Sequence, residues 1–213
     1  MGQYRDWGLS KAEHAVFKKL TTPIKIQDFL DSLPRNWEKH GNTLMSPRRV
    51  LWERKVHCIE AAFFAAAALW FNGEEPFVMD LQATSDDYDH VIAVYKRYGY
   101  YGAISKTNHT GLRFRDPVYK TYRELAMSYF HEYLHDIDHR KTLRTYSAPV
   151  NLKRFGSEWI TAEEDLIDIA YAVDSMRHFP VAPTKNLRLV RAADKMEQRA
   201  NRILEWKKSD PRT

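Results

Sequence analysis

The stretch Cys58–Phe71, CIEAAFFAAAALWF, decides the fold of this chain. It is apolar on almost every side, and the Asn-Gly pair that follows at residues 72–73 is a typical helix end. A helix without a polar face belongs in the middle of a domain, where other elements cover it. We therefore expect a central buried helix whose first residue is Cys58.

Three segments downstream of this helix have the composition of β-strands. The one at residues 90–95, HVIAVY, is rich in β-branched side chains and is flanked by similar segments at 77–81 and 100–108. The short link around Gly99 predicts that the last two segments form a β-hairpin. Together with the central helix they indicate an α+β fold, with helices on a small antiparallel sheet.

Helix-start signals flank this unit. Ser46-Pro47 predicts a short helix before the central one, and Asp116-Pro117 predicts the start of a long helix that reaches about residue 136. Two more helices are predicted over residues 162–176 and 187–207.

These elements divide the chain into three parts. We expect an N-terminal helical segment over residues 1–45, a catalytic core over 46–136, and a C-terminal extension over 137–213 that is mostly helical and packs on the core.

Composition narrows the classes of partner. The 213 residues carry a formal net charge of +5, and the most basic region, residues 185–208, also contains three acidic side chains, as expected for a solvated helix face rather than a nucleic-acid interface. No apolar stretch reaches the ~20 residues of a membrane span, and no signal peptide is visible. The single cysteine fits a reducing compartment, so we expect a cytoplasmic protein without membrane contact.

Cys58 is the first candidate catalytic residue. A helix N-terminus stabilises a thiolate through its free N–H groups and its dipole, and the same groups can hold the oxyanion formed after attack on a carbonyl. A second oxyanion donor is expected from Trp52 or Gln82. The competing interpretation is a structural thiol, because free cysteine is among the most buried residue types.

His90 is the candidate base, and hairpin geometry suggests the group that orients its ring. A three-residue loop over 98–100 would pair His90 with Asn108 on one face of the hairpin. A loop one residue shorter or longer would shift the partner to Thr107 or His109. We therefore take Asn108 as the orienting group.

Asp116 is the alternative orienting group. Its position directly before Pro117 is also explained by helix capping, which is why Asn108 is preferred.

Three sequence segments resemble the transglutaminase-like and papain-like cysteine enzyme superfamily. They are SPRRVLWERKVHCIEAAFFAAA, DDYDHVIAVYKRYGYYGAISKTN and RDPVY, within about residues 46–136. The resemblance implies a core with the cysteine on a central helix packed on a small antiparallel sheet. Members carry Cys, His and Asp or Asn in this order, which corresponds to Cys58, His90 and either Asn108 or Asp116.

The same resemblance implies a reaction. It points to an amidase, peptidase or acyltransferase that forms a thioester with a peptide- or amide-containing substrate and needs no cofactor. The sequence departs from transglutaminases around both residues: His57 stands where they often have Gly or Trp, and Val91-Ile92 where they often have Trp.

A zinc peptidase is the second enzymatic alternative. His131-Glu132-Tyr133-Leu134-His135 matches the HExxH pattern, and His139 is four residues further on. On a helix, His131, His135 and His139 would share one face and could bind Zn²⁺, with the glutamate as base. The charged residues around the pattern favour a solvated helix end. A non-catalytic binding module on the same fold is the second hypothesis, and the zinc peptidase is the third.

Overall fold

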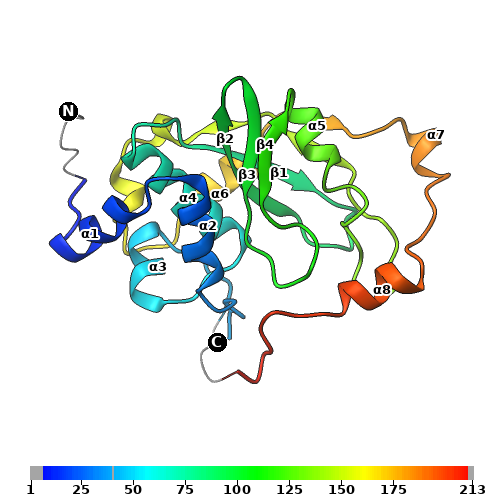
Figure 1. Ribbon diagram of the computed structural model, residues 1–213, viewed down its shortest axis with the longest axis horizontal. Coiled ribbons are helices and arrows are strands. Elements are labelled where there is room, and N and C mark those ends of the chain that lie inside the picture. Colours follow the sequence, from blue (N-terminus) through cyan, green and yellow to red (C-terminus); the bar gives the residue numbers. More distant parts are fainter. Residues whose placement is uncertain (1–6, 40, 211–213) are drawn as a thin grey trace.

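The computed structural model describes residues 7–39 and 41–210 and contains a seven-stranded antiparallel sheet (Figure 1). The strand order is β4-β3-β2-β1-β5-β7, and β6 also pairs with β1. The strands are β1 (Phe77–Gln82), β2 (His90–Arg97), β3 (Tyr100–Ile104), β4 (Arg115–Tyr119), β5 (Thr145–Ser147), β6 (Val150–Asn151) and β7 (His178–Pro180). The expected α+β class is confirmed.

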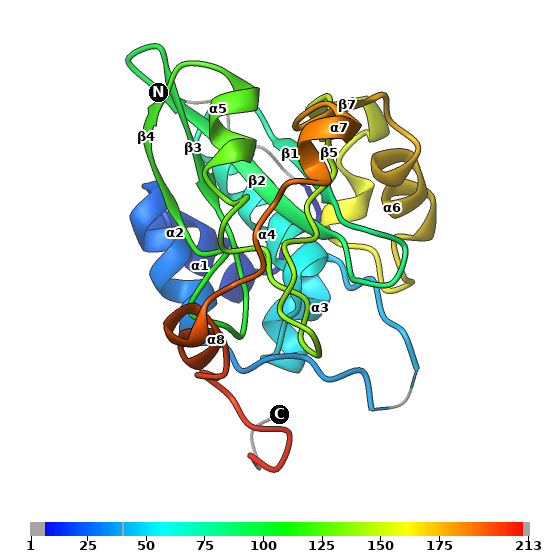
Figure 2. The same ribbon diagram turned by 90° about the vertical axis from the view of Figure 1, so that its right-hand side faces the viewer.

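The helices lie on both sides of this sheet. The first four gather on one side and α5 packs on the other, while the C-terminal residues run along one end of the molecule (Figures 1 and 2). The helices are α1 (Lys11–Lys19), α2 (Pro23–Asp31), α3 (Pro47–Glu53), α4 (Cys58–Phe71), α5 (Tyr122–Met127), α6 (Ile167–Asp174), α7 (Thr184–Leu187) and α8 (Lys195–Asn201), with two 3₁₀ turns, η1 (Leu152–Phe155) and η2 (Glu158–Ile160).

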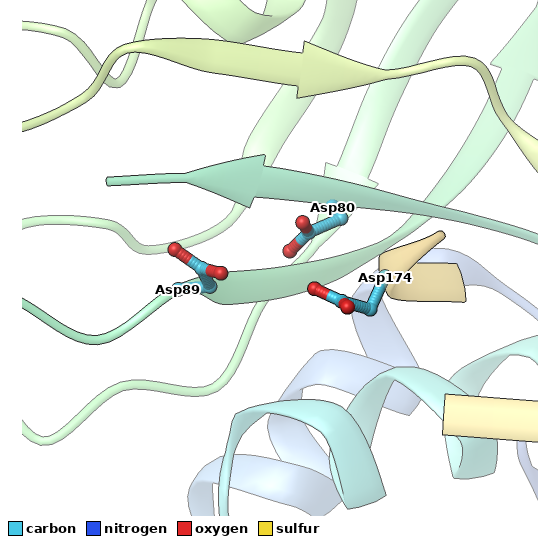
Figure 3. A group of neighbouring side chains, drawn as sticks. All are labelled: Asp80, Asp89 and Asp174. Carbon is cyan, nitrogen blue, oxygen red and sulfur yellow. The ribbon is translucent and has the colours of Figure 1, made fainter. Parts of the chain in front are cut away.

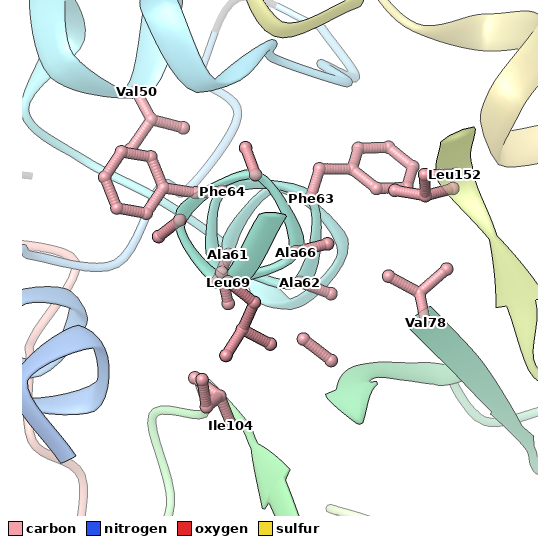
Figure 4. Close-up of a cluster of buried hydrophobic side chains, with 14 of the residues drawn as sticks. Val50, Ala61, Ala62, Phe63, Phe64, Ala66, Leu69, Val78, Ile104 and Leu152 are labelled. Atoms are coloured by element: carbon pink, nitrogen blue, oxygen red, sulfur yellow. The ribbon is translucent and has the colours of Figure 1, made fainter. Parts of the chain in front are cut away.

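Helix α4 is the centre of the larger hydrophobic core, as predicted. Every side chain from Glu60 to Trp70 is buried, and Phe63, Phe64 and Leu69 point outward in different directions into the surrounding elements (Figure 4). The four alanines at 65–68 let neighbouring elements approach the helix closely. This packing fixes the position of the helix N-terminus, where Cys58 lies.

Strand β2 is buried on both faces of the sheet. Val91 and Ala93 belong to the core cluster around α4, whereas Ile92 and Val94 belong to a second cluster that includes Leu125 of α5. A strand covered on both faces has a continuous apolar sequence, which is what HVIAVY displays. The buried strand therefore holds His90, its first residue, in a fixed position.

The hairpin between β2 and β3 differs from the prediction by one residue. Arg97 pairs with Tyr100, so the loop consists of Tyr98 and Gly99, which take φ angles of 49° and 89°. Two consecutive positive φ angles are typical of a type I′ turn. The predicted three-residue loop is therefore wrong. Continuing the observed pairing places Thr107 opposite His90, and a shift of one residue moves Asn108 to the other face.

The long helix predicted from Asp116 is also wrong. RDPVY forms the edge strand β4, where Pro117 is tolerated because an edge strand needs fewer ladder hydrogen bonds. The helix starts later, at α5, where the hydroxyl of Thr121 accepts the backbone N–H of Glu124 at 3.1 Å. Turns follow α5, so residues 128–135 are not helical.

The C-terminal part completes the sheet. Residues 137–210 contribute β5, β6 and β7 as well as three short helices, so this extension is not mostly helical.

No helix in the described ranges is long and apolar enough to cross a membrane.

Candidate active site

Cys58 and His90 line the same cavity, which has a volume of about 770 Å³. Cys58 is the first residue of α4 and His90 the first residue of β2. The two residues singled out from the sequence are thus brought together by the ends of the two most buried elements. Trp52 and Gln82, expected as oxyanion donors, are not among the described residues that line this cavity.

Cys58 is half-buried, in contrast to the fully buried residues that follow it in α4. Burial raises the pKa of its thiol, but hydrogen bonds to His57 and His90 outweigh that effect, so the pKa lies well below its ordinary value. The lowered pKa favours the thiolate over the thiol, at the helix end whose dipole also stabilises a negative charge.

His57 is the N-cap residue of α4 and hydrogen-bonds to Cys58. Its Nε2 lies 2.9 Å from the carbonyl oxygen of Thr43, which can only accept, so Nε2 carries a proton. Burial lowers the pKa of His57, but the hydrogen bonds to Cys58 and Glu60 raise it to about 11. His57 is therefore a fixed imidazolium beside the thiolate.

Glu60 supplies the counter-charge for His57. Its carboxylate is fully buried and lies 3.3 Å from Nε2 of His57. It also accepts hydrogen bonds from the backbone N–H of His57, the hydroxyl of Thr43, the N–H of Met45 and the amide of Asn36. Burial raises the pKa of Glu60, but these contacts, His57 first, lower it below its ordinary value. A buried carboxylate with this many donors remains charged.

His90 is oriented by Ser105, which lies just beyond the end of β3. Nε2 of His90 is 2.7 Å from Oγ of Ser105, and the same hydroxyl donates its proton to the carbonyl oxygen of Leu112 at 2.5 Å. Because the hydroxyl has one proton, Oγ must accept from His90, and Nε2 carries a hydrogen. The other ring nitrogen, Nδ1, is left to exchange a proton with Cys58.

Ser105 is in turn held by Gln27 of α2. The side-chain amide of Gln27 accepts the backbone N–H of Ser105 at 3.0 Å and donates to its carbonyl oxygen at 2.9 Å. Gln27 is itself buried. A chain of fixed contacts thus runs from α2 through Ser105 to the imidazole of His90.

Neither residue expected to orient His90 does so in the structure. Asn108 lines the cavity, but its side-chain amide binds both backbone groups of Trp206, at 2.9 and 2.8 Å. Asp116 is exposed on β4 and does not line the cavity. The prediction of Asn108 depended on a three-residue hairpin loop, whereas the loop has two residues. The prediction of Asp116 depended on its position at a helix start, whereas it lies in strand β4.

The HExxH residues do not assemble a zinc site in the described part of the chain. His131, His135 and His139 are not on a helix and form no cluster of metal ligands. Glu132 is engaged by Arg115 at 2.5 Å, and Nδ1 of His135 lies 2.9 Å from Asp138.

Three carboxylates in the cavity are better placed to hold a metal ion. Asp80, Asp89 and Asp174 each offer an oxygen within 4.8 Å of the others (Figure 3), and all three line the cavity that contains Cys58. No local sequence pattern connects these three residues, because they come from β1, the loop before β2 and the end of α6.

The sequence patterns also did not identify four residues that support Cys58 and His90, namely His57, Glu60, Ser105 and Gln27. A signal existed for the first two, because a glutamate three residues after an N-cap position is typical of a capping box. None existed for Gln27 and Ser105, whose contact spans 78 residues.

No protein-family model matches the chain, and no curated protein matches its sequence. Its chemistry is therefore inferred from the arrangement of Cys58, His57 and His90.

Proposed function

We propose that this protein is a cysteine-dependent acyl-transfer enzyme, an amidase or peptidase that acts through a thioester between its substrate and Cys58. The observation that carries the proposal is a half-buried cysteine at the N-terminus of a buried helix, hydrogen-bonded to two imidazoles and facing a cavity of about 770 Å³. A structural cysteine needs none of these features.

The two imidazoles have different tasks in this proposal. His57, with its pKa of about 11, keeps its proton throughout and holds Cys58 as a thiolate. His90 exchanges protons through Nδ1, while Ser105 fixes its ring. One group stabilises charge and the other transfers protons.

The reaction proceeds in two balanced steps. Nδ1 of His90 first takes the thiol proton of Cys58. The Cys58 sulfur then attacks the carbonyl carbon, a C–S bond forms, and the C–N bond of the amide breaks as Nδ1 gives this proton to the leaving amine. Water then attacks the thioester while His90 takes one of its protons, which releases a carboxylic acid and the thiolate. An amine in place of water would give transfer instead.

The resemblance to transglutaminase-like and papain-like enzymes supports this proposal through the order of Cys58 and His90. The departure is Ser105, which takes the position that an Asn or Asp has in those enzymes. A serine accepts the imidazole N–H but carries no charge, so more of the stabilisation of the thiolate falls to His57.

An activated ester tests the proposal without knowledge of the natural substrate. Incubation with p-nitrophenyl acetate should add one acetyl group to Cys58, detected by intact-protein mass spectrometry, with a burst of nitrophenolate. Cys58→Ser should abolish the adduct, and His90→Ala should slow it. The exposed His131 offers a matched control, because His131→Ala should change neither.

A non-catalytic module is the competing outcome. If Cys58 is acetylated no faster than the thiol of a short cysteine peptide, and His90→Ala has no effect, the proposal is wrong and the cavity serves binding alone.

A further inference from the structure

We propose that Asp80, Asp89 and Asp174 form a binding site for a divalent, oxygen-seeking cation of the Ca²⁺ class in the wall of the cavity that holds Cys58. Their carboxylates point toward a common centre (Figure 3), with one oxygen of each within 4.8 Å of the others. The site uses none of the residues assigned to acyl transfer.

Asp80 provides the observation that points to a ligand. It is 2% exposed, and its Oδ1 is buried without a hydrogen-bond partner among the described residues. Burying a carboxylate oxygen without a donor is strongly unfavourable. A cation at the centre of the three carboxylates would supply the missing partner.

Two of the carboxylates are oriented as metal ligands usually are. Oδ2 of Asp80 lies 3.0 Å from Nε2 of His178, and Oδ1 of Asp89 accepts the backbone N–H of Ala83 at 2.8 Å. In each case one oxygen is fixed by a protein donor and the other stays available for coordination. Asp174 is the last residue of α6, and the negative end of a helix dipole also favours a cation.

The donor set and spacing select the class of ion. Three carboxylates and no sulfur favour a hard cation over Zn²⁺. Ca²⁺ binds oxygen at about 2.3–2.6 Å, so two ligands of one ion can lie up to about 5 Å apart, whereas for Mg²⁺ the limit is about 4.2 Å. The upper bound of 4.8 Å between the ligand oxygens lies within the range that Ca²⁺ accepts. Its remaining coordination positions face the cavity, where water or a substrate oxygen can fill them.

Calorimetric titration of EDTA-treated, dialysed protein with CaCl₂ tests the site directly. We expect one saturable site per chain and weaker binding of MgCl₂. Asp174→Asn should weaken Ca²⁺ binding at least about tenfold. Asp168→Asn, on the same helix but outside the cluster, should leave binding unchanged.

Two further measurements distinguish failure of this proposal from failure of the acyl-transfer proposal and from loss of folding. Cys58→Ser should bind Ca²⁺ as the native chain does, so failure of the acyl-transfer proposal would not affect this one. Without Ca²⁺, Asp174→Asn should unfold at the same or a higher temperature than the native chain, since it removes like-charge repulsion. Addition of Ca²⁺ should raise the melting temperature of the native chain but not that of Asp174→Asn.

Three results would overturn the proposal. They are the absence of saturable Ca²⁺ binding at millimolar concentration, equal binding by Asp174→Asn, and binding of methylammonium chloride in place of Ca²⁺. The last would assign the three carboxylates to a substrate ammonium group.

Discussion

Nε2 of His90 lies 2.7 Å from Oγ of Ser105, and because that hydroxyl donates to Leu112, the serine must accept the imidazole N–H. This one contact decides which ring nitrogen faces Cys58. It also gives Ser105 a positioning role without contact to substrate.

Ser105→Ala should therefore impair turnover more than thiol alkylation. Loss of one buried hydrogen bond costs about 1–2 kcal/mol, so we expect nitrophenyl ester turnover to fall roughly tenfold, while the alkylation pKa of Cys58, set largely by His57, changes little. Ser105→Thr, which keeps the hydroxyl, should restore turnover. Equal losses in both variants would mean that the site is only sensitive to packing.

His57→Gln should change how stability depends on pH. The pKa of His57 is raised from an ordinary 6.5 to about 11, so its contribution to the free energy of unfolding is complete below pH 6.5 and fades as pH rises toward 11. The stability difference between the native chain and His57→Gln should shrink over this window in denaturant titrations. His135→Gln is the matched control, and a difference independent of pH would contradict the ion-pair assignment.

Asn108→Ala should loosen the C-terminal residues without disturbing the thiol. Both hydrogen bonds to Trp206 are lost, for a destabilisation of about 1–3 kcal/mol, and limited proteolysis should cut faster beyond α8. The alkylation pKa of Cys58 should stay unchanged. A roughly tenfold fall in nitrophenyl ester turnover, the result expected for Ser105→Ala, would instead restore Asn108 as the residue that orients His90.

His131→Ala should leave both metal content and thiol reactivity unchanged. The described structure gathers no zinc ligands around this residue, so elemental analysis of EDTA-treated protein should find no stoichiometric zinc. Tight zinc that is lost in His131→Ala would revive the metallopeptidase hypothesis.

The sequence was sufficient to predict the elements that carry the strongest local signals. Cys58 does begin α4 and His90 does begin β2, because an all-apolar helix and a β-branched strand have few alternative places in a fold. The hairpin loop was less predictable. Tyr98 adopts a positive φ angle, which is usually found at Gly or Asn. A tyrosine at this position therefore does not predict a two-residue turn.

That single-residue error had consequences for the site. Side chains alternate between the two faces of a sheet. A loop that is one residue longer therefore places Asn108, instead of Ser105, on the same face as His90. Asp116 was misplaced for a different reason: Asp-Pro is compatible with both a helix start and an edge strand, and pairing with β3 decided between them. Contacts that depend on distant segments, such as Gln27 with Ser105, have no local signature.

The pH-rate profile of iodoacetamide alkylation of Cys58 tests the central claim most directly, measured on the native chain, His57→Gln and His90→Ala. We predict an inflection well below the ordinary ~8.5 in the native chain, and a higher one in each variant, since each removes one hydrogen-bond partner of the thiolate. An inflection near ~8.5 in all three proteins, or alkylation only after unfolding, would contradict an activated cysteine and leave Cys58 as a structural residue.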